Sequence, residues 1–184
     1  MKNFKSSSES QINMSLLMTP SHSNFSGKIH GGYILNLMDE IAFACASKHS
    51  GNYCVTASVN RVDFLNPVDV GELLHLKASI NYTGNTSMVV GLRVEAENIR
   101  TGKVKHCNSS YFTMVSKDEN GVGIEVPGLI LDTEESIRRF ARSMERQSQS
   151  RIRKESFKPS EFQIKKYFDV LKEHNVKITF KGDH

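Results

Sequence analysis

Residues 24–40 read Asn-Phe-Ser-Gly-Lys-Ile-His-Gly-Gly-Tyr-Ile-Leu-Asn-Leu-Met-Asp-Glu. From Gly32 onward, apolar residues recur at helical spacing, which predicts an apolar helix as far as about Lys48. They are Ile34, Leu37, Met38, Ile41, Ala42 and Cys45. His30 and Gly31 would lie with Gly32 at the start of this helix, where the first backbone N–H groups are unpaired and carry partial positive charge. Such a helix end can hold a polarised carbonyl oxygen or an anion.

Asp39 places a carboxylate on this largely apolar helix. At about 100° per residue it falls beside the apolar stripe, near Leu35 and Phe43, so we expect partial burial. One interpretation is structural, with the carboxylate accepting hydrogen bonds or pairing with a cation. The other is catalytic, as a general base or a nucleophile. The glycine pair and Asn24 upstream favour the catalytic interpretation.

After this helix the hydrophobic period changes to two. Residues 74–82 and 88–96 alternate between apolar and polar side chains, which is typical of half-buried antiparallel strands. Turn signals at 82–85 and 100–102 join neighbouring strands into hairpins. With further strands expected at 53–59, 61–65 and 103–115, the chain is predicted to be α+β: about five antiparallel strands curved around one long helix.

Several motifs together resemble those of a known family. The run Asn24, Gly27, His30-Gly31-Gly32 and Leu37-Met38-Asp39-Glu40 is similar to the active-site segment of hot-dog-fold acyl-CoA thioesterases of the cytosolic acyl-CoA hydrolase type. Matching stretches follow in order at 55–59, 63–68, 71, 84–88, 111–113 and 126–140, so the resemblance covers roughly residues 15–142. It implies the hot-dog fold, a role in lipid metabolism, and hydrolysis of acyl-CoA thioesters to a free carboxylic acid and coenzyme A.

The resemblance also implies roles for individual residues. Asp39 would be the general base or nucleophile, and Asn24 would orient water or bind an oxygen. Gly31 and Gly32 would polarise the thioester carbonyl, with His30 as a substrate-side contact or a loop-packing residue. In relatives the asparagine and aspartate of one site come from different hot-dog units. Since this chain has one such unit, a homodimer is the expected minimum, and a hexamer built as a trimer of dimers is the larger assembly that the family suggests.

Coenzyme A carries a diphosphate and a ribose phosphate, so a cationic rim is expected. The resemblance implicates the turn of Asn85, Thr86 and Ser87. Candidate cations are Arg61, Arg93 and Lys105, each of which is equally well explained as a solvated strand residue. Coenzyme A would enter as part of the substrate, and no cofactor or metal is expected because paired Cys/His ligand spacing is absent from the sequence.

The 184 residues suit one domain with an extension. We expect a flexible N-terminus at 1–14, the hot-dog domain at 15–131 and a mainly helical extension at 132–184. Residues 133–184 hold 13 basic and 8 acidic side chains, and their interleaving favours a solvated helix over a nucleic-acid interface. The sequence has no secretory signal and no apolar run of membrane-spanning length, which favours a cytoplasmic location without a membrane partner.

Three cysteines, Cys45, Cys54 and Cys107, lie inside predicted elements and are interpreted as small buried hydrophobes. The alternative function is a non-catalytic hot-dog module that senses acyl-CoA and regulates a partner or nucleic acid. The presence of both Asn24 and Asp39 argues against it, as does the lack of a helix-turn-helix signal before residue 20. A hot-dog dehydratase would need a histidine paired with an acid, and Asp39 has no good candidate.

Overall fold

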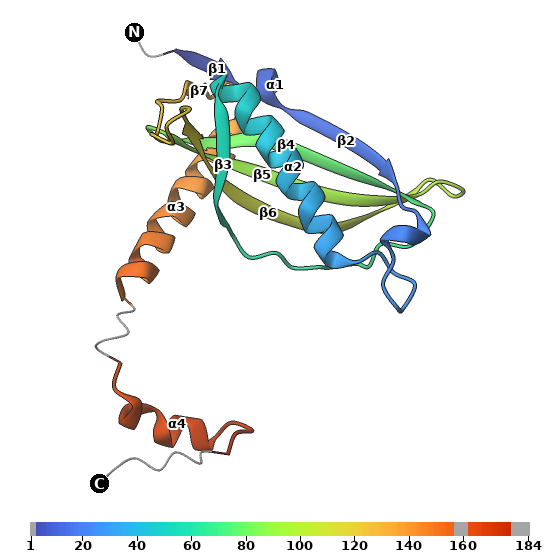
Figure 1. Cartoon of the computed structure of the whole chain (residues 1–184), viewed down its shortest axis with the longest axis vertical. Coiled ribbons are helices and arrows are strands. Elements are labelled where there is room, and N and C mark those ends of the chain that lie inside the picture. The colour runs from blue at the N-terminus through green and yellow to red at the C-terminus, as the bar shows by residue number, and fades with distance from the viewer. Residues whose placement is uncertain (1–2, 157–161, 178–184) are drawn as a thin grey trace. The chain divides into compact units, whose positions relative to one another are not determined.

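The computed structural model describes residues 3–156 and 162–177 (Figure 1). The chain divides into two compact units, residues 1–144 and 145–184. The first unit contains one long helix, α2 (Gly31–Ser50), and a five-stranded sheet. The predicted helix is confirmed and ends two residues later than expected. It ends because Gly51 adopts a left-handed conformation, φ 75°, and donates its N–H to the Ser47 carbonyl.

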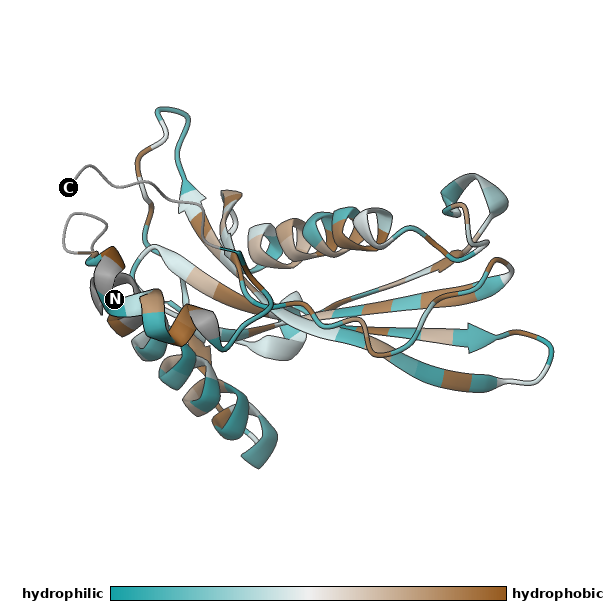
Figure 2. Ribbon diagram, turned by 90° about the horizontal axis from the view of Figure 1, so that it is seen from below, coloured by the Kyte–Doolittle hydropathy of each residue, from teal (hydrophilic) through white to brown (hydrophobic). Residues whose placement is uncertain are grey.

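The main sheet is antiparallel, with the strand order β2-β4-β5-β6-β3. Its strands are β2 (Ile12–Leu17), β3 (Tyr53–Val59), β4 (Glu72–Thr83), β5 (Ser87–Asn98) and β6 (Lys103–Lys117). Helix α2 lies across one face of this sheet (Figure 1). Figure 2 shows hydrophobic and hydrophilic residues alternating along the strands. This alternation is the sequence pattern from which strands were predicted. The α+β hot-dog architecture is therefore confirmed.

Two strand assignments differ from the prediction. Residues 61–65 form no strand and instead run as a loop along β6, where Asn60 and Leu65 donate their N–H groups to the carbonyls of Tyr111 and Cys107. The fifth strand is β2, which pairs with β4 from Ile12↔Ala78 to Leu17↔Leu73. Its alternate residues are half-buried, as expected for an edge strand with one face on the core.

Regular structure begins at Phe4, whereas a flexible segment was expected at 1–14. Strand β1 (Phe4–Ser6) pairs in parallel with β7 (Gly128–Ile130), and the short helix α1 (Ser7–Ser10) follows. Ser6 and Glu9 form a capping box at its start. The N-terminus is thus tied to the segment that follows the main sheet.

The core lies between α2 and the sheet. From the helix it takes Ile34, Leu37, Met38, Ile41, Ala42, Cys45 and Ala46, and from β4 and β5 the alternate residues that face the helix. The three cysteines are buried and free, as predicted for small hydrophobic side chains. Burial raises the pKa of the Cys45 thiol to about 12, so Cys45 is a small apolar core residue and not a nucleophile.

The predicted tail helix is α3 (Glu134–Ser156). Within the first unit its Phe140 ring packs 5.0 Å from the ring of Tyr82, and Arg139 Nη1 donates to Ser79 Oγ at 3.3 Å. In the second unit a 3₁₀ turn, η3 (Ile164–Tyr167), leads into α4 (Phe168–Lys172). Residues 157–161 and 178–184 of the mainly helical extension expected at 132–184 lie outside the described residues. No helix in the described part of the chain has the length and apolarity needed to cross a membrane.

Candidate active site

Asp39 lies near the middle of α2, on the side that meets β3. The Thr56 hydroxyl on β3 donates to Asp39 Oδ1 at 2.6 Å. Thr56 Oγ1 also lies 3.4 Å from the sulfur of buried Met114, so the threonine is held from the sheet side as well. In the described residues no second donor reaches the carboxylate, which leaves Oδ2 available to a substrate or a water molecule.

The expected partial burial of Asp39 is wrong for the single chain, in which its side chain is exposed. The stripe position was assigned correctly, but nothing within one chain covers this side of the helix. Large apolar side chains on α2 and β3 are exposed too: Phe43 (39 %), Tyr53 (63 %) and Val59 (49 %). An exposed carboxylate among exposed apolar groups is the pattern of a surface that another molecule covers.

Asn24 lies in a tight loop that precedes α2, after the 3₁₀ turn η1 (Pro20–His22). Its Oδ1 accepts hydrogen bonds from Ser26 N (2.9 Å), Ser26 Oγ (2.7 Å) and Lys28 N (3.2 Å). Two of these donors are backbone N–H groups, so the atom facing the loop must be the oxygen. The Nδ2 group is therefore the part of the exposed Asn24 amide that remains for a ligand, and it is a donor.

His30 caps the N-terminus of α2, and its Nδ1 accepts the N–H of Gly32 at 3.0 Å. The Gly32 donor is therefore engaged, which differs from the expectation that both glycine N–H groups are unpaired. The Gly31 N–H has no partner among the described residues and is the donor that this helix end presents. Each glycine also has a packing role: a Cβ at Gly31 would lie 3.2 Å from Phe64 Cζ, and a Cβ at Gly32 would lie 3.0 Å from His30 Nδ1.

Asn24 and Asp39 do not meet within one chain. The loop of Asn24 lies beyond the start of α2, whereas Asp39 lies eight residues into the helix, or about 12 Å along its axis. No hydrogen bond between described residues joins their side chains. A site that uses both residues therefore needs a second copy or a ligand long enough to span them.

The structure does not bring the coenzyme A candidates together. The Asn85–Ser87 turn is held by backbone hydrogen bonds, with Thr86 O accepting from Ser116 N and Asn85 O accepting from Val126 N, both at 2.9 Å. Arg93 lies six residues along β5 from Ser87, roughly 20 Å away.

The candidate cations all have carboxylate partners. Arg93 pairs with Glu95 at 2.7 Å, and Arg61 pairs with Asp63 at 2.8 Å. Lys105 contacts Asp69 at 3.1 Å and Glu72 at 2.9 Å. A groove of about 720 Å³ lies between the start of β3 and the turn after β6, and none of the predicted site residues is among those that line it.

The family model that matches the chain is that of the thioesterase superfamily, over residues 26–103. Protein VdlD of Helicobacter pylori is 44 % identical over 133 residues, which cover 72 % of this chain and 76 % of VdlD. The uncharacterized acyl-CoA thioester hydrolase YkhA of Bacillus subtilis is 30 % identical over 146 residues, 79 % of this chain and 85 % of YkhA. The chain belongs to the thioesterase superfamily. Several of its relatives and structural neighbours are named acyl-CoA thioesterases or acyl-CoA hydrolases.

Solved structures of this superfamily have the same fold. A hexameric acyl-CoA thioesterase matches with a TM-score of 0.81 and 34 % identity, over 85 % of this chain and 99 % of its own. An acyl-CoA hydrolase of Staphylococcus aureus, in complex with butyryl coenzyme A and coenzyme A, matches with a TM-score of 0.77 and 30 % identity, over 82 % and 92 % of the two chains. Three further structures of that hydrolase each carry one alanine substitution, which replaces an asparagine, an aspartate or a threonine. The aspartate follows the asparagine by 15 residues, and the threonine follows the aspartate by 17.

Thr56 is the one residue at this site to which the sequence had assigned no role. It lies in the stretch 55–59 that resembles the family, but nothing in its spacing distinguishes it from an ordinary strand threonine. Its hydrogen bond to Asp39 depends on how β3 lies against α2, which only the folded chain specifies.

Proposed function

We propose that this thioesterase-superfamily protein hydrolyses acyl-CoA thioesters to a free carboxylic acid and coenzyme A, with Asp39 as the general base or nucleophile. The observation that carries the proposal is the Asp39–Thr56 pair on an otherwise uncovered face of α2. Asn24, Asp39 and Thr56 also have the same order and the same spacing, 15 and 17 residues, as the three residues replaced in the Staphylococcus aureus hydrolase.

The geometry gives each group a defined task. Thr56 fixes one carboxylate oxygen of Asp39 and leaves Oδ2 to take a proton from water or to attack the carbonyl carbon. If Oδ2 attacks, the Asp39 carboxyl oxygen bonds to the acyl carbon, the C–S bond breaks, and the sulfur leaves as the thiol of coenzyme A after protonation. Water then cleaves the resulting anhydride and regenerates Asp39.

The thioester oxygen gains negative charge in either route and needs donors. Asn24 Nδ2 and the Gly31 N–H are the two that the loop and the helix end present. In acyl-transfer sites, loss of one such donor raises the barrier by about 3 kcal/mol. Asn24 therefore acts through its NH₂ group on an oxygen, because its own oxygen is occupied inside the loop.

The proposal includes a homodimer as the active unit, since Asn24 and Asp39 lie apart within one chain. Strand β3 is a sheet edge that carries the exposed Tyr53 and Val59, and such an edge can pair with the same strand of a second copy. That pairing would also cover Phe43 and the surroundings of Asp39. Assembly into a hexamer, as in the hexameric neighbour, is the larger state that the proposal allows.

The test is cleavage of butyryl-CoA and of longer acyl-CoA esters by the purified protein, followed as free thiol. We expect turnover in the parent and a loss of at least about 100-fold in Asp39→Ala, with the circular dichroism spectrum unchanged. Binding of coenzyme A esters without turnover would instead favour the acyl-CoA-sensing module. Equal turnover in Asp39→Ala and the parent would remove Asp39 from the mechanism.

A further inference from the structure

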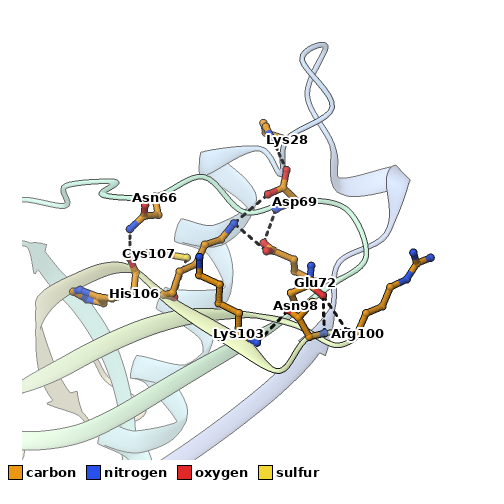
Figure 3. Close-up of polar contacts among 11 residues, drawn as sticks. Lys28, Asn66, Asp69, Glu72, Asn98, Arg100, Lys103, His106 and Cys107 are labelled. Atoms are coloured by element: carbon orange, nitrogen blue, oxygen red, sulfur yellow. Dashed lines mark hydrogen bonds and ion pairs between the residues drawn. The ribbon is translucent and has the colours of Figure 1, made fainter.

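The side chains of Lys28, Asp69, Glu72 and Lys105 form a charged cluster. Figure 3 shows three of its members, Lys28, Asp69 and Glu72. The Lys28 ammonium pairs with Asp69 Oδ1, and Lys105 Nζ lies 3.1 Å from Asp69 Oδ2 and 2.9 Å from Glu72 Oε1. The Asp69 N–H donates to Glu72 Oε2 at 2.8 Å. Asp69 is thus held through its backbone and through both carboxylate oxygens.

The cluster is anchored in the sheet. Glu72 begins β4 and is only 7 % exposed, so its carboxylate needs the Lys105 cation and the Asp69 N–H as partners. Lys105 comes from β6. Hydrogen bonds from Lys28, and next from Lys105, hold the pKa of the Asp69 carboxyl below its ordinary value. This shift favours the ionised carboxylate, which is the form that pairs with the Lys28 ammonium.

Lys28 connects this anchor to Asn24 directly. Its backbone N–H donates to Asn24 Oδ1 at 3.2 Å, and its carbonyl accepts the Asn24 N–H at 2.7 Å. Lys28 also forms an isolated antiparallel bridge with Asp69, and the next residue, Ile29, donates its N–H to Val68 O at 2.9 Å. A displacement of Lys28 would therefore move two hydrogen bonds of Asn24, one accepted by its side-chain Oδ1 and one donated by its backbone N–H.

We propose that Lys28 and Asp69 are positioning residues for Asn24, and that their ion pair fixes the direction in which Asn24 Nδ2 points. This inference rests on the proposed function of Asn24 as a donor to the substrate. Neither residue needs to touch the substrate for this role.

Stability alone is a poor explanation for the pair. The Lys28 and Asp69 side chains are 45 % and 39 % exposed, and ion pairs with that exposure add little to the free energy of folding. The effect of the pair on the position of Asn24 can be much larger than its effect on stability. A displacement of about 1 Å at a catalytic group is enough to reduce turnover strongly. A matched control is Lys77, which pairs with Glu95 at 2.6 Å on the main sheet and contacts none of the described residues of the loop.

The test is a double-mutant cycle with Lys28→Met and Asn24→Ala, read as kcat and KM, with Lys28→Arg and Lys77→Met alongside. We expect Lys28→Met to lower kcat by about tenfold with little change in KM or Tm, and Lys28→Arg to keep most of the activity. In the Asn24→Ala background, Lys28→Met should cause no further loss, because nothing remains to be positioned. An equal loss in both backgrounds, or parent-like kcat in Lys28→Met, would overturn the proposal.

Amide hydrogen exchange separates this inference from the proposed function. The Ser26 and Lys28 amides, which donate to Asn24 Oδ1, should exchange faster in Lys28→Met and at the parent rate in Lys77→Met. Unchanged exchange in Lys28→Met would refute the positioning role even if the enzyme is active. Absence of turnover in the parent would refute the proposed function and leave the exchange result to decide whether the ion pair orders the loop.

Discussion

The Thr56 hydroxyl lies 2.6 Å from Asp39 Oδ1 and so joins the edge strand β3 to the middle of helix α2. Thr56 is the only side chain in the described part of the chain that hydrogen-bonds this carboxylate. The orientation of Asp39 therefore depends on one hydroxyl from a strand that forms the edge of the sheet.

Replacing Thr56 with valine should lower kcat with little effect on stability. Valine keeps the β-branched shape that suits a strand but cannot donate to Asp39, and Thr56 is exposed in the single chain. We expect a fall of about 10- to 100-fold in kcat, measured as free thiol released from butyryl-CoA. Thr56→Ser keeps the hydroxyl and should stay within a few-fold of the parent; a matching loss in both variants would contradict the role of the hydroxyl.

The sequence predicted the parts of the fold that local pattern determines. The apolar period of residues 34–45 specified α2, and alternation specified β4 and β5. Strand β2 was missed because it is short, half-exposed and preceded by a serine-rich polar segment. Residues 61–65 have the composition of a strand, but the chain leaves the sheet after β3 and follows β6 with two backbone hydrogen bonds, which do not form a continuous ladder.

At the candidate site, the sequence proposed Asn24 and Asp39 but not Thr56, and it predicted none of their contacts. The resemblance singled out Asn24 and Asp39, yet the occupation of Asn24 Oδ1 and of the Gly32 N–H follows from loop geometry that no spacing encodes. Arg93 shows a limit of a different kind. Period-two alternation already places it on the same face as Glu95, and the folded chain pairs the two, so its charge alone was a weak reason to assign it to coenzyme A.

Two strongly impaired variants should restore activity when they form a mixed dimer. If each site takes Asn24 from one chain and Asp39 from the other, an Asn24→Ala/Asp39→Ala dimer contains one site with both residues intact. Equal amounts of the two variants, unfolded in urea and refolded together, should recover about a quarter of the parent turnover, because half of the dimers are mixed and each has one working site of two. Separately refolded variants serve as the control, and a mixture no more active than these would place both residues in one chain.

His49 should make the stability of the protein sensitive to acid. Its ring is fully buried, with Nδ1 3.1 Å from Ser10 Oγ and Nε2 3.3 Å from the Pro127 carbonyl. Burial is the largest cause that lowers its pKa, and the Pro127 hydrogen bond only partly opposes it; Lys5 lowers it further and Glu9 raises it. The neutral ring is thus the form that the folded state favours.

The direction of this pH dependence follows from the linkage between protonation of His49 and folding. Because the folded pKa lies below the unfolded value of about 6.5, the contribution of His49 is complete above pH 6.5 and is lost as pH falls through the folded pKa. Urea midpoints measured from pH 7.5 to pH 5 should therefore fall more steeply in the parent than in His49→Gln, whose uncharged amide can donate to the Pro127 carbonyl in place of Nε2 and does not titrate. Parallel curves for the two proteins would show that His49 does not titrate on unfolding.

Gly31 allows the N–H donor at the start of α2 to be removed without a change of fold. Gly31 is the first helical residue, a position that proline favours, and His30 has φ −65° and ψ 126°, a conformation that a following proline accepts. Gly31→Pro should therefore fold normally but lack the donor, with a loss of about 100- to 1000-fold in kcat. Gly31→Ala is the matched control, because its Cβ makes the same 3.2 Å approach to the half-exposed Phe64 ring while the N–H remains. A kcat for Gly31→Pro equal to that of Gly31→Ala would show that this N–H does not stabilise the developing oxyanion, and the donor role would then rest on Asn24 alone.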